Sequence, residues 1–376
     1  MQSGRSPGPS WLDSLAMHAA QQKRIVVAMS GGVDSSTAAA ILKTQGHEVI
    51  GVGLRLPALL SEEPSERGCC GFRGMDDARR VASLIGIPFY VLDYRDVFNE
   101  TIVDYFCRCY LEGKTPNPCV ECNRAVKFGR LLSLAEALEA DCVASGHYAR
   151  TYLDPDTGRF GLKKGLHADK DQSYFLYPLT QHQLSKVLFP LGELTKDETR
   201  AVAKSLGLHV CDKPASQDAC FLGDGDYRRF LAQRYPESLA EGPIVDKKGR
   251  VLGQHRGIAF YTVGQRKGLG VAAGEPLYVL SVDRTTRTVT VGTSEELETS
   301  EVAVSRVSWL ACNEQPDSLE AMVKFRYRQE EQPATISCMG GNRVLVRLRT
   351  PQSRPAAGQS AVFYNDDIVL GGGIID

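Results

Sequence analysis

The first half of the chain alternates between short apolar runs and segments in which apolar residues recur at helical spacing. The apolar runs predict buried strands at Arg24–Met29, Val49–Leu54, Phe89–Leu92 and Cys142–Ser145. The segments between them predict helices at Ser35–Gln45, Met75–Leu84, Asn99–Leu111 and Val126–Glu139. Strands and helices that alternate at this pitch predict an α/β domain with a doubly wound parallel sheet, which binds its ligands at the carboxyl ends of the strands.

The pattern changes near residue 215 and is strand-like beyond Gly242. Short runs between turn residues predict strands at Pro276–Val282, Thr288–Val291, Val302–Trp309, Ala321–Tyr327, Ala334–Ser337, Arg343–Leu348 and Ser360–Tyr364. They indicate a small β-rich unit and then a β-barrel or sandwich. We therefore expect an α/β domain at 24–214, a small central domain at 215–282 and a C-terminal β-barrel at 283–376.

Composition narrows the class of protein only slightly. The formal net charge of the 376-residue chain is -1, so binding to nucleic acid would need a local basic surface. Eleven cysteines without regular spacing fit a reducing compartment better than a disulfide framework. No run approaches the roughly 18 apolar residues of a membrane span. Residues 1–23 are rich in Ser, Gly and Pro and predict a disordered tail, with a transit peptide as the alternative, so we expect a cytoplasmic protein.

The stretch Ser30–Ser35 (S-G-G-V-D-S), directly after the first strand, predicts a phosphate-binding loop. Adjacent glycines let backbone N–H groups approach an anion, and the N-terminus of the following helix adds a favourable partial charge. No Walker A lysine follows, which excludes that class of NTPase. A simple tight turn is the alternative, but the strand before the loop and the helix after it favour anion binding.

In this setting S-G-G-V-D-S resembles the pyrophosphate loop of the ATP-pyrophosphatase (PP-loop) superfamily. The resemblance implies an enzyme that splits ATP between its first and second phosphates, adenylates a substrate oxygen and lets a nucleophile displace AMP. It also implies that Asp34 helps to hold the Mg²⁺ that bridges the phosphates.

Five further motifs narrow the resemblance. They are G-K-T-P-N-P-C-V-E-C-N-R-A-V-K-F at 113–128, S-G-H-Y-A-R at 145–150, K-D-Q-S-Y-F-L at 170–176, S-Q-D-A-C-F-L at 216–222 and G-Q-R-K-G-L-G at 264–270. In this order they are similar to the tRNA-specific 2-thiouridylases (the MnmA family), over nearly everything after residue 23. That family has a PP-loop ATP-pyrophosphatase domain, a small central domain and a C-terminal β-barrel, which agrees with the division above.

The resemblance implies a tRNA sulfurtransferase that replaces the 2-oxygen of the wobble uridine in the tRNAs for Lys, Glu and Gln by sulfur. ATP drives the exchange, and a persulfide carrier or sulfide donates the sulfur. The implied catalytic residues are Cys122 and Cys220. The implied nucleotide contacts are Ala28, Met29, Ser30, Gly31, Gly32, Val33, Asp34, Ser35, Leu54 and Gly146. The implied tRNA contacts are Asn117, Pro118, Cys119, His147, Lys170, Asp171, Gln172, Arg326, Tyr327 and Gln359, of which the first three face the target base.

Two patterns in the residues agree with these roles. Cys119 and Cys122 lie where a loop enters the predicted Val126 helix, and a helix N-terminus or a nearby cation lowers the pKa of a thiol. Basic residues alternate along two predicted strands and would project to one face, where RNA phosphates could bind: Lys324, Arg326, Arg328, Arg343, Arg347 and Arg349. The alternative for this second pattern is a solvated strand face.

The family usually carries an acidic residue at the position of Cys119, and this departure leaves two mechanisms open. In the favoured one, Cys119, Cys122 and Cys220 hold a [4Fe–4S] cluster whose open iron binds a sulfide. In the other, a persulfide on Cys220 attacks the adenylated carbon, and Cys122 frees the product by forming a disulfide. Structural zinc is disfavoured because it normally takes four ligands, and the C-x-x-C offers no fourth at a suitable spacing.

Two alternative functions stay open, and the remaining cysteines are expected to have structural roles or have none assigned. A PP-loop enzyme that adenylates a different substrate oxygen is the enzymatic alternative, and a non-catalytic metal- or RNA-binding protein is the other. Cys107, Cys109, Cys142, Cys312 and Cys338 are expected to be small packed residues. The Cys69-Cys70 pair has no assigned role.

Overall fold

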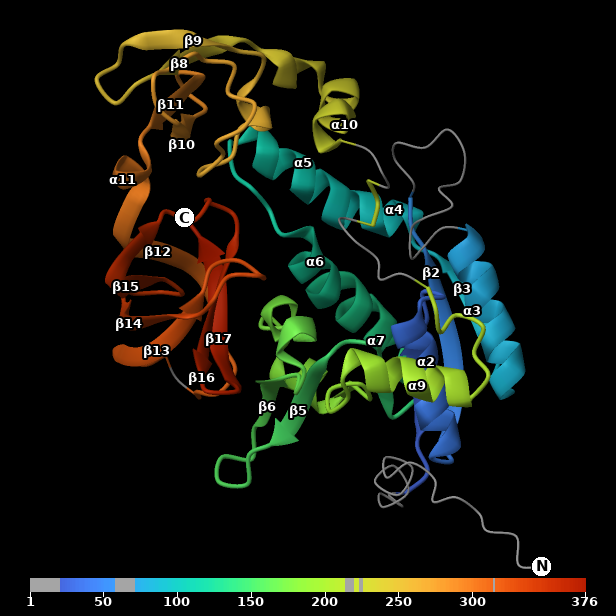
Figure 1. Cartoon of the computed structure of the whole chain (residues 1–376). Coiled ribbons are helices and arrows are strands. Elements are labelled where there is room, and N and C mark those ends of the chain that lie inside the picture. The colour runs from blue at the N-terminus through green and yellow to red at the C-terminus, as the bar shows by residue number, and fades with distance from the viewer. Residues whose placement is uncertain (1–20, 58–71, 214–219, 223–225, 314) are drawn as a thin grey trace, which may run out of the picture.

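The computed structural model describes residues 21–57, 72–213, 220–222, 226–313 and 315–376. Within this part of the chain there are three sheets (Figure 1). Nearly all of the predicted tail at 1–23, together with Cys69 and Cys70, lies outside the described residues, so the predictions for them stay predictions. No helix within the described ranges is long and apolar enough to cross a membrane.

The first sheet is parallel and has five strands. They are β1 (Arg24–Ala28), β2 (Glu48–Arg55), β3 (Phe89–Asp93), β4 (Cys142–Ala144) and β7 (Val187–Leu188), in the order β3-β2-β1-β4-β7. Neighbouring residues of β1, Val26 and Val27, are both fully buried, in hydrophobic clusters on opposite faces of the sheet. Burial on both faces is the reason why β1 is a continuous apolar run.

Helices cover both faces of this sheet (Figure 1), and the predicted doubly wound α/β fold is confirmed. The helices on the face of Val27 are α2 (Val33–Thr44), α3 (Phe72–Ile85) and α9 (Lys196–Ser205). Those on the face of Val26 are α4 (Arg95–Phe98), α5 (Asp104–Leu111), α6 (Pro118–Glu121) and α7 (Leu131–Ala137). Two π-helical segments, Asn99–Val103 and Cys122–Arg130, join α4 to α5 and α6 to α7.

The helix that was predicted to begin at Val126 begins earlier, at Pro118. The side chain of Asn117 accepts a hydrogen bond from the backbone N–H of Val120, and proline fills the first helical position. Asn at the N-cap followed by Pro is a favoured helix start, so this signal was present in the sequence. Cys119 and Cys122 therefore lie inside the first turns of a helix and not in the loop before it.

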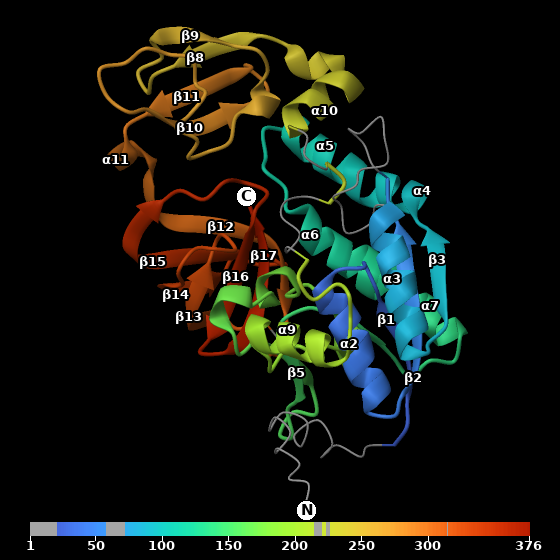
Figure 2. The same ribbon diagram turned by 45° about the vertical axis from the view of Figure 1, so that its right-hand side comes forward.

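The central unit contains a mixed four-stranded sheet, next to helix α10 (Tyr227–Arg234). Its strands are β8 (Gly242–Val245), β9 (Val251–His255), β10 (Tyr278–Asp283) and β11 (Thr288–Gly292), in the order β10-β11-β8-β9. In Figure 2 the sheet lies beside the barrel and away from the parallel sheet. Because β11 pairs with β10 and β8, we propose a domain boundary after Gly292 in place of the expected one after residue 282.

The C-terminal barrel has six strands and follows helix α11 (Ser294–Leu297). The strands are β12 (Glu298–Trp309), β13 (Ser318–Lys324), β14 (Gln332–Cys338), β15 (Val344–Ser353), β16 (Ser360–Asn365) and β17 (Ile368–Ile375). Pairing of β12 with β17 closes the barrel, as predicted from the strand pattern.

A hairpin of the first domain joins the barrel. Its strands β5 (Ala149–Leu153) and β6 (Phe160–Lys164) precede helix α8 (Gln181–Ser185), and β6 pairs with β17. The α/β domain and the barrel therefore share one eight-stranded sheet. This shared sheet holds the two domains together.

The prediction that Lys324, Arg326 and Arg328 alternate along one strand is wrong. β13 ends at Lys324, and the carbonyl oxygen of Arg326 accepts a hydrogen bond from the N–H of Gln329 in a turn. Turn geometry ends the period-two alternation, although the Arg326 and Arg328 side chains are both exposed.

Candidate active site

Three groups of predicted nucleotide contacts gather at the carboxyl edge of the parallel sheet. β1 leads directly into Ser30–Ser35, Leu54 lies at the end of β2, and Gly146 follows β4. β1 pairs with β2 on one side and with β4 on the other, so the strand order reverses between β1 and β4. Doubly wound sheets open their ligand crevice at such a switch point.

The loop between β1 and α2 has the backbone of an anion site. Gly31 has φ +73°, and a Cβ there would lie 1.9 Å from the carbonyl oxygen of Gly74, so only glycine fits. The backbone N–H of Ser30 donates to Ser35 Oγ at 3.1 Å, and Gly32 is the N-cap of the twelve-residue helix α2. The loop thus presents a helix N-terminus at the switch point.

Asp34 of this loop is held by two residues that sequence reasoning did not single out. Lys196 Nζ lies 2.5 Å from Asp34 Oδ1, and the Tyr148 hydroxyl donates to the same oxygen at 2.8 Å. Tyr148 belongs to the S-G-H-Y-A-R motif, which could have signalled it. Lys196 follows a Thr that starts a helix, and nothing local distinguishes it from any first-turn lysine.

The two predicted catalytic cysteines lie in one hydrophobic cluster, on the Val26 face of the sheet. Cys122 is 8% exposed within this cluster. Cys220 is partly buried and packs against the same cluster. Phe221, next to Cys220, places its ring 5.7 Å from that of Phe98. Cys119, in contrast, is exposed on the first turn of α6.

A metal site formed by these cysteines receives no support. Among the described residues, no three side chains of His, Cys, Asp or Glu are grouped so that they could hold a metal ion. Cys119, Cys122 and Cys220 are all within the described ranges, and they form no such group. The sequence-based preference for a [4Fe–4S] cluster is therefore unsupported.

His147, a predicted tRNA contact, is enclosed by aromatic rings. Its Nδ1 lies 2.7 Å from Ser145 Oγ, and its ring packs against Phe128 and Phe189. Burial, with a smaller effect of Lys127, lowers the pKa of His147 well below its ordinary value. The imidazole is therefore neutral near pH 7, so any contact of His147 with RNA would be a hydrogen bond and not an ion pair.

The predicted tRNA contacts at 170–172 have structural duties as well. The Asp171 carboxylate is 5% exposed and accepts hydrogen bonds from the N–H groups of Gly165 and Ser173, both at 3.0 Å. Gln172 Oε1 accepts from the backbone N–H of Tyr148 at 3.0 Å. This segment therefore supports Tyr148, which in turn holds Asp34, and its role toward tRNA stays a prediction.

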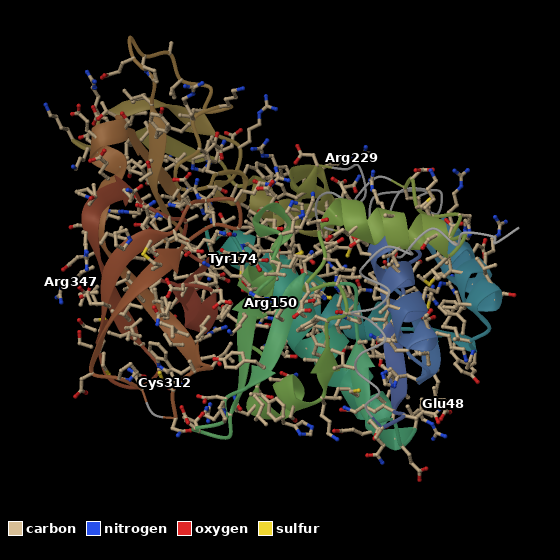
Figure 3. All side chains as sticks on the ribbon, turned by 60° about the horizontal axis from the view of Figure 1, so that its bottom comes forward. Glu48, Arg150, Tyr174, Arg229, Cys312 and Arg347 are labelled. Atoms are coloured by element: carbon tan, nitrogen blue, oxygen red, sulfur yellow. The ribbon has the colours of Figure 1, made fainter. Side chains whose placement is uncertain are left out.

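Tyr327, beside Arg326, packs next to that segment, against the residues that follow it, although it is far from them in sequence. The Tyr327 ring is 4.6 Å from the Phe175 ring, and the Tyr174 hydroxyl donates to the carbonyl oxygen of Ser360 at 2.9 Å. Figure 3 shows Tyr174 between the barrel and the α/β domain. The fold thus brings together two of the predicted tRNA-contact segments.

Gln359 fixes the loop that leads into the helix with the cysteines. Its side-chain amide donates to the carbonyl oxygens of Thr115 at 2.9 Å and Pro116 at 3.1 Å. Thr115 also donates its backbone N–H to the carbonyl oxygen of Ala357, and its Oγ1 lies 3.0 Å from that of Thr262 in the central unit. The barrel and the central unit therefore both position the start of α6.

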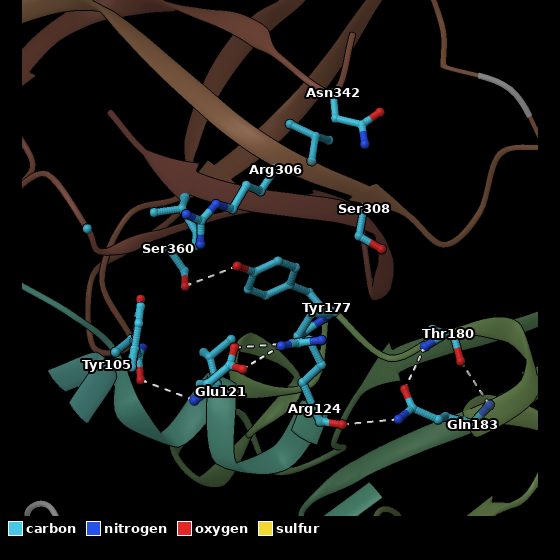
Figure 4. A pocket seen from close by; sticks show the side chains of 16 residues that line it. Tyr105, Glu121, Arg124, Tyr177, Thr180, Gln183, Arg306, Ser308, Asn342 and Ser360 are labelled. Atoms are coloured by element: carbon cyan, nitrogen blue, oxygen red, sulfur yellow. Dashed lines mark hydrogen bonds and ion pairs between the residues drawn. The ribbon is translucent and has the colours of Figure 1, made fainter. Parts of the chain in front are cut away.

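A pocket of about 520 Å³ lies between α6 and the barrel (Figure 4). One face of the helix and the inner edge of the barrel line it, through Asn117, Val120, Glu121, Arg124, Arg306 and Ser360. With 3.6 residues per turn, Cys119 and Cys122 lie on the opposite face of the helix. The pocket is therefore separate from the thiol site.

Three predicted RNA-binding arginines are engaged in surface ion pairs. Arg343 binds Asp376, Arg347 binds Glu301, and Arg349 binds Glu320, with nitrogen–oxygen distances of 2.8, 2.9 and 3.0 Å. Arg347 projects from the outside of the barrel (Figure 3). A carboxylate beside each guanidinium reduces its attraction for RNA phosphates.

Three family models match consecutive parts of the chain. They are described as a tRNA methyl transferase HUP domain at residues 23–224, a tRNA methyl transferase PRC-barrel domain at 228–293 and an aminomethyltransferase beta-barrel domain at 299–375. The first model alone covers more than half of the chain. The three segments correspond to the α/β domain, the central unit and the barrel described above.

Curated relatives match over nearly the full length. The tRNA-specific 2-thiouridylase MnmA of Moorella thermoacetica is 49% identical over 93% of this chain and 99% of its own. That of Heliobacterium modesticaldum is 48% identical over 94% and 92%. A solved 4-thiouridine synthetase–RNA complex with bound ATP covers 57% of this chain and 51% of its own at 16% identity, with a TM-score of 0.36, too low to bear on fold or function. The chain belongs to the MnmA family of tRNA-specific 2-thiouridylases, which are tRNA sulfurtransferases of the PP-loop superfamily.

Proposed function

We propose that the chain uses ATP to adenylate the 2-oxygen of the wobble uridine in the tRNAs for Lys, Glu and Gln, and then replaces that oxygen by sulfur. The observation that carries the proposal is the switch point of the sheet, where the Ser30–Ser35 loop, Leu54 and Gly146 meet. A carbonyl oxygen is a poor leaving group, and transfer of AMP to it turns it into a good one. In this proposal Ser30, Gly31, Gly32 and Ser35 cradle the phosphates, and Asp34 would supply a carboxylate oxygen to Mg²⁺.

Sulfur is proposed to travel on the Cys220 thiol. A persulfide carrier first transfers its outer sulfur to Cys220. The terminal sulfur of this persulfide attacks C2 of the adenylated uridine, and the C2–O bond breaks as AMP leaves. The Cys122 thiolate then attacks Cys220 Sγ, which breaks the bond to the transferred sulfur and leaves 2-thiouridine and a Cys122–Cys220 disulfide. A thiol reductant restores both cysteines.

Two observations support this route over a cluster. Cys122 lies in the hydrophobic cluster against which Cys220 packs, and no metal-binding group is found among the described residues. Anaerobically purified protein is expected to contain far less than one iron per chain and to thiolate tRNA with a persulfide donor. Iron and sulfide in stoichiometric amounts, whose removal stops thiolation, would overturn the route.

The proposed reaction is tested with unmodified tRNA transcripts, ATP, Mg²⁺ and a persulfide donor. We expect 2-thiouridine at the wobble position of the transcripts for Lys, Glu and Gln, with one pyrophosphate released for each uridine converted. Transcripts with cytidine at the wobble position serve as the control and should release none. Equal pyrophosphate release without tRNA would mean that the chain adenylates something else.

Removal of Arg326 and Arg328 is expected to weaken tRNA binding and to lower its dependence on salt. Both side chains are exposed in the turn after β13, on either side of Tyr327, whose ring packs against that of Phe175. Each phosphate contact on single-stranded RNA contributes about 0.7 to the slope of log affinity against log salt. Titration of tRNA at several salt concentrations should therefore show a slope smaller by about 1.4 for the double alanine variant.

Arg347→Ala is the matched control for this experiment. Arg347 is exposed on the barrel but paired with Glu301, so its replacement is expected to leave the slope nearly unchanged. A larger loss from Arg347→Ala than from the turn arginines would place the RNA on the other side of the barrel.

A further inference from the structure

The phosphate loop has no lysine of its own, yet a buried lysine from another helix reaches it. Lys196 is the first residue of α9, is 9% exposed, and places its Nζ 2.5 Å from Asp34 Oδ1. Thr195 caps α9 and fixes where the helix starts, through a reciprocal capping box with Glu198. Packing of α9 against α2 therefore brings a cation to the first turn of the loop helix.

A tyrosine completes the contact. The Tyr148 hydroxyl donates to Asp34 Oδ1 at 2.8 Å and lies 3.0 Å from Thr199 Oγ1, one turn after Lys196 on α9. Tyr148 itself is 3% exposed, and its backbone N–H is held by Gln172. Helix α9 and the segment after β4 thus hold the same carboxylate oxygen.

The two oxygens of Asp34 have different surroundings. Oδ1 takes both hydrogen bonds, whereas Oδ2 accepts none from the described residues. The side chain is 32% exposed, so it is open on one side. Carboxylate oxygens are the ligands that Mg²⁺ prefers, and the unoccupied oxygen is the one available to the Mg²⁺ that accompanies ATP.

Stability does not explain this arrangement. Removing a lysine and a carboxylate from water costs about as much free energy as their attraction returns, so a buried pair is a weak stabiliser. What two donors on one oxygen do provide is orientation, because together they restrict rotation of the carboxylate. A carboxylate with a fixed direction loses less entropy when it binds a cation.

We propose that Lys196 and Tyr148 are positioning residues of the nucleotide site: by binding Oδ1 together, they turn Oδ2 of Asp34 toward the Mg²⁺ of MgATP. The inference rests on the proposed ATP site at the Ser30–Ser35 loop. It assigns neither residue a direct contact with the phosphates.

The test measures ATP binding to the intact chain without tRNA, by calorimetry at several Mg²⁺ concentrations. Lys196→Met and Tyr148→Phe are each expected to raise the Mg²⁺ concentration for half-maximal ATP binding by roughly 3- to 10-fold, with Lys196→Arg closer to wild type. In an Asp34→Asn background the same two substitutions should have no further effect. If either effect persists fully in that background, the residue acts on ATP without Asp34, and the inference is wrong.

Two controls separate the causes of failure. Lys204→Met removes an exposed lysine of the same helix and should leave ATP binding unchanged, and thermal unfolding of each variant shows whether it folds. If wild-type protein binds no ATP, or Asp34→Asn binds it normally, the proposed ATP site fails. If Asp34→Asn weakens binding while Lys196→Met and Tyr148→Phe behave like wild type, only the inference fails.

Discussion

Alanine at Cys122 or Cys220 is expected to reduce tRNA thiolation by roughly a thousandfold or more, because each thiol forms or breaks a bond in the proposed sequence. Another thiol of the same cluster, Cys107, cannot replace them, since burial raises its pKa to about 11 and keeps it protonated. ATP binding and the first release of pyrophosphate should persist in both variants, because adenylation precedes the sulfur steps. Single-turnover formation of 2-thiouridine, measured by mass spectrometry, checks the result.

Cys119→Ala is the matched control. Cys119 is exposed and forms or breaks no bond in the persulfide route, so this variant is expected to lose far less of the thiolation rate than the other two, with any loss arising from its predicted contact with tRNA. Loss of activity in all three alanine variants, together with iron in the wild-type protein, would favour the cluster. Normal thiolation by Cys122→Ala or Cys220→Ala would exclude both mechanisms.

Gly146→Ala is expected to weaken ATP binding by tenfold or more, which corresponds to about 1.4 kcal/mol. A Cβ at this position would lie 2.6 Å from both the carbonyl carbon of Asp34 and the backbone nitrogen of Ser35. Both contacts are with backbone, so the loop would have to move away from the end of β4. Overpacking of this kind also costs about 1–3 kcal/mol of unfolding free energy. Calorimetric titration with MgATP and thermal unfolding measure the two effects.

Gly274→Ala separates steric collision from the general cost of replacing glycine. No atom lies within 4 Å of the Cβ that alanine would add there, so ATP affinity and stability are expected to stay near wild type. If Gly146→Ala binds ATP as tightly as Gly274→Ala, the crevice between β1 and β4 is not the nucleotide site.

The parallel sheet could be predicted from local pattern because its strands are buried on both faces. For β1, β2 and β3, the predicted and observed bounds differ by no more than one residue at each end. In the barrel, strand β17 escaped prediction because I-V-L-G-G-G-I-I contains three glycines, which indicate a turn. The fold needs them, since a Cβ on Gly371 would lie 2.4 Å from the carbonyl oxygen of Ser308 on β12. Close approach of two strands is a tertiary event with no local sign.

In the candidate site, too, some features could be predicted from local sequence and others depended on the tertiary structure. Motifs in the sequence predicted the loop at Ser30–Ser35, the pair Cys119 and Cys122, and Cys220 as site residues, because phosphate binding and thiol chemistry require particular residue types at short spacing. The preference for a cluster came from Cys119 in place of an acidic residue, which completes a C-x-x-C pair with Cys220 as a third ligand. The structure gives this preference no support, because no group of ligands is found among the described residues and metal ligation depends on distances between residues far apart in the chain.

The sequence by itself therefore determined the family and the order of the three domains, and it predicted the groups that are proposed to carry the chemistry. Only the tertiary structure decided that Lys196 and Tyr148 share Asp34, that Gln359 holds the loop before α6, and that Arg326 lies in a turn. The physical reason for this difference is that a motif specifies the residue types, and so the functional groups, that the reaction needs. The direction of a carboxylate or the anchoring of a loop depends instead on packing between segments that share no local pattern.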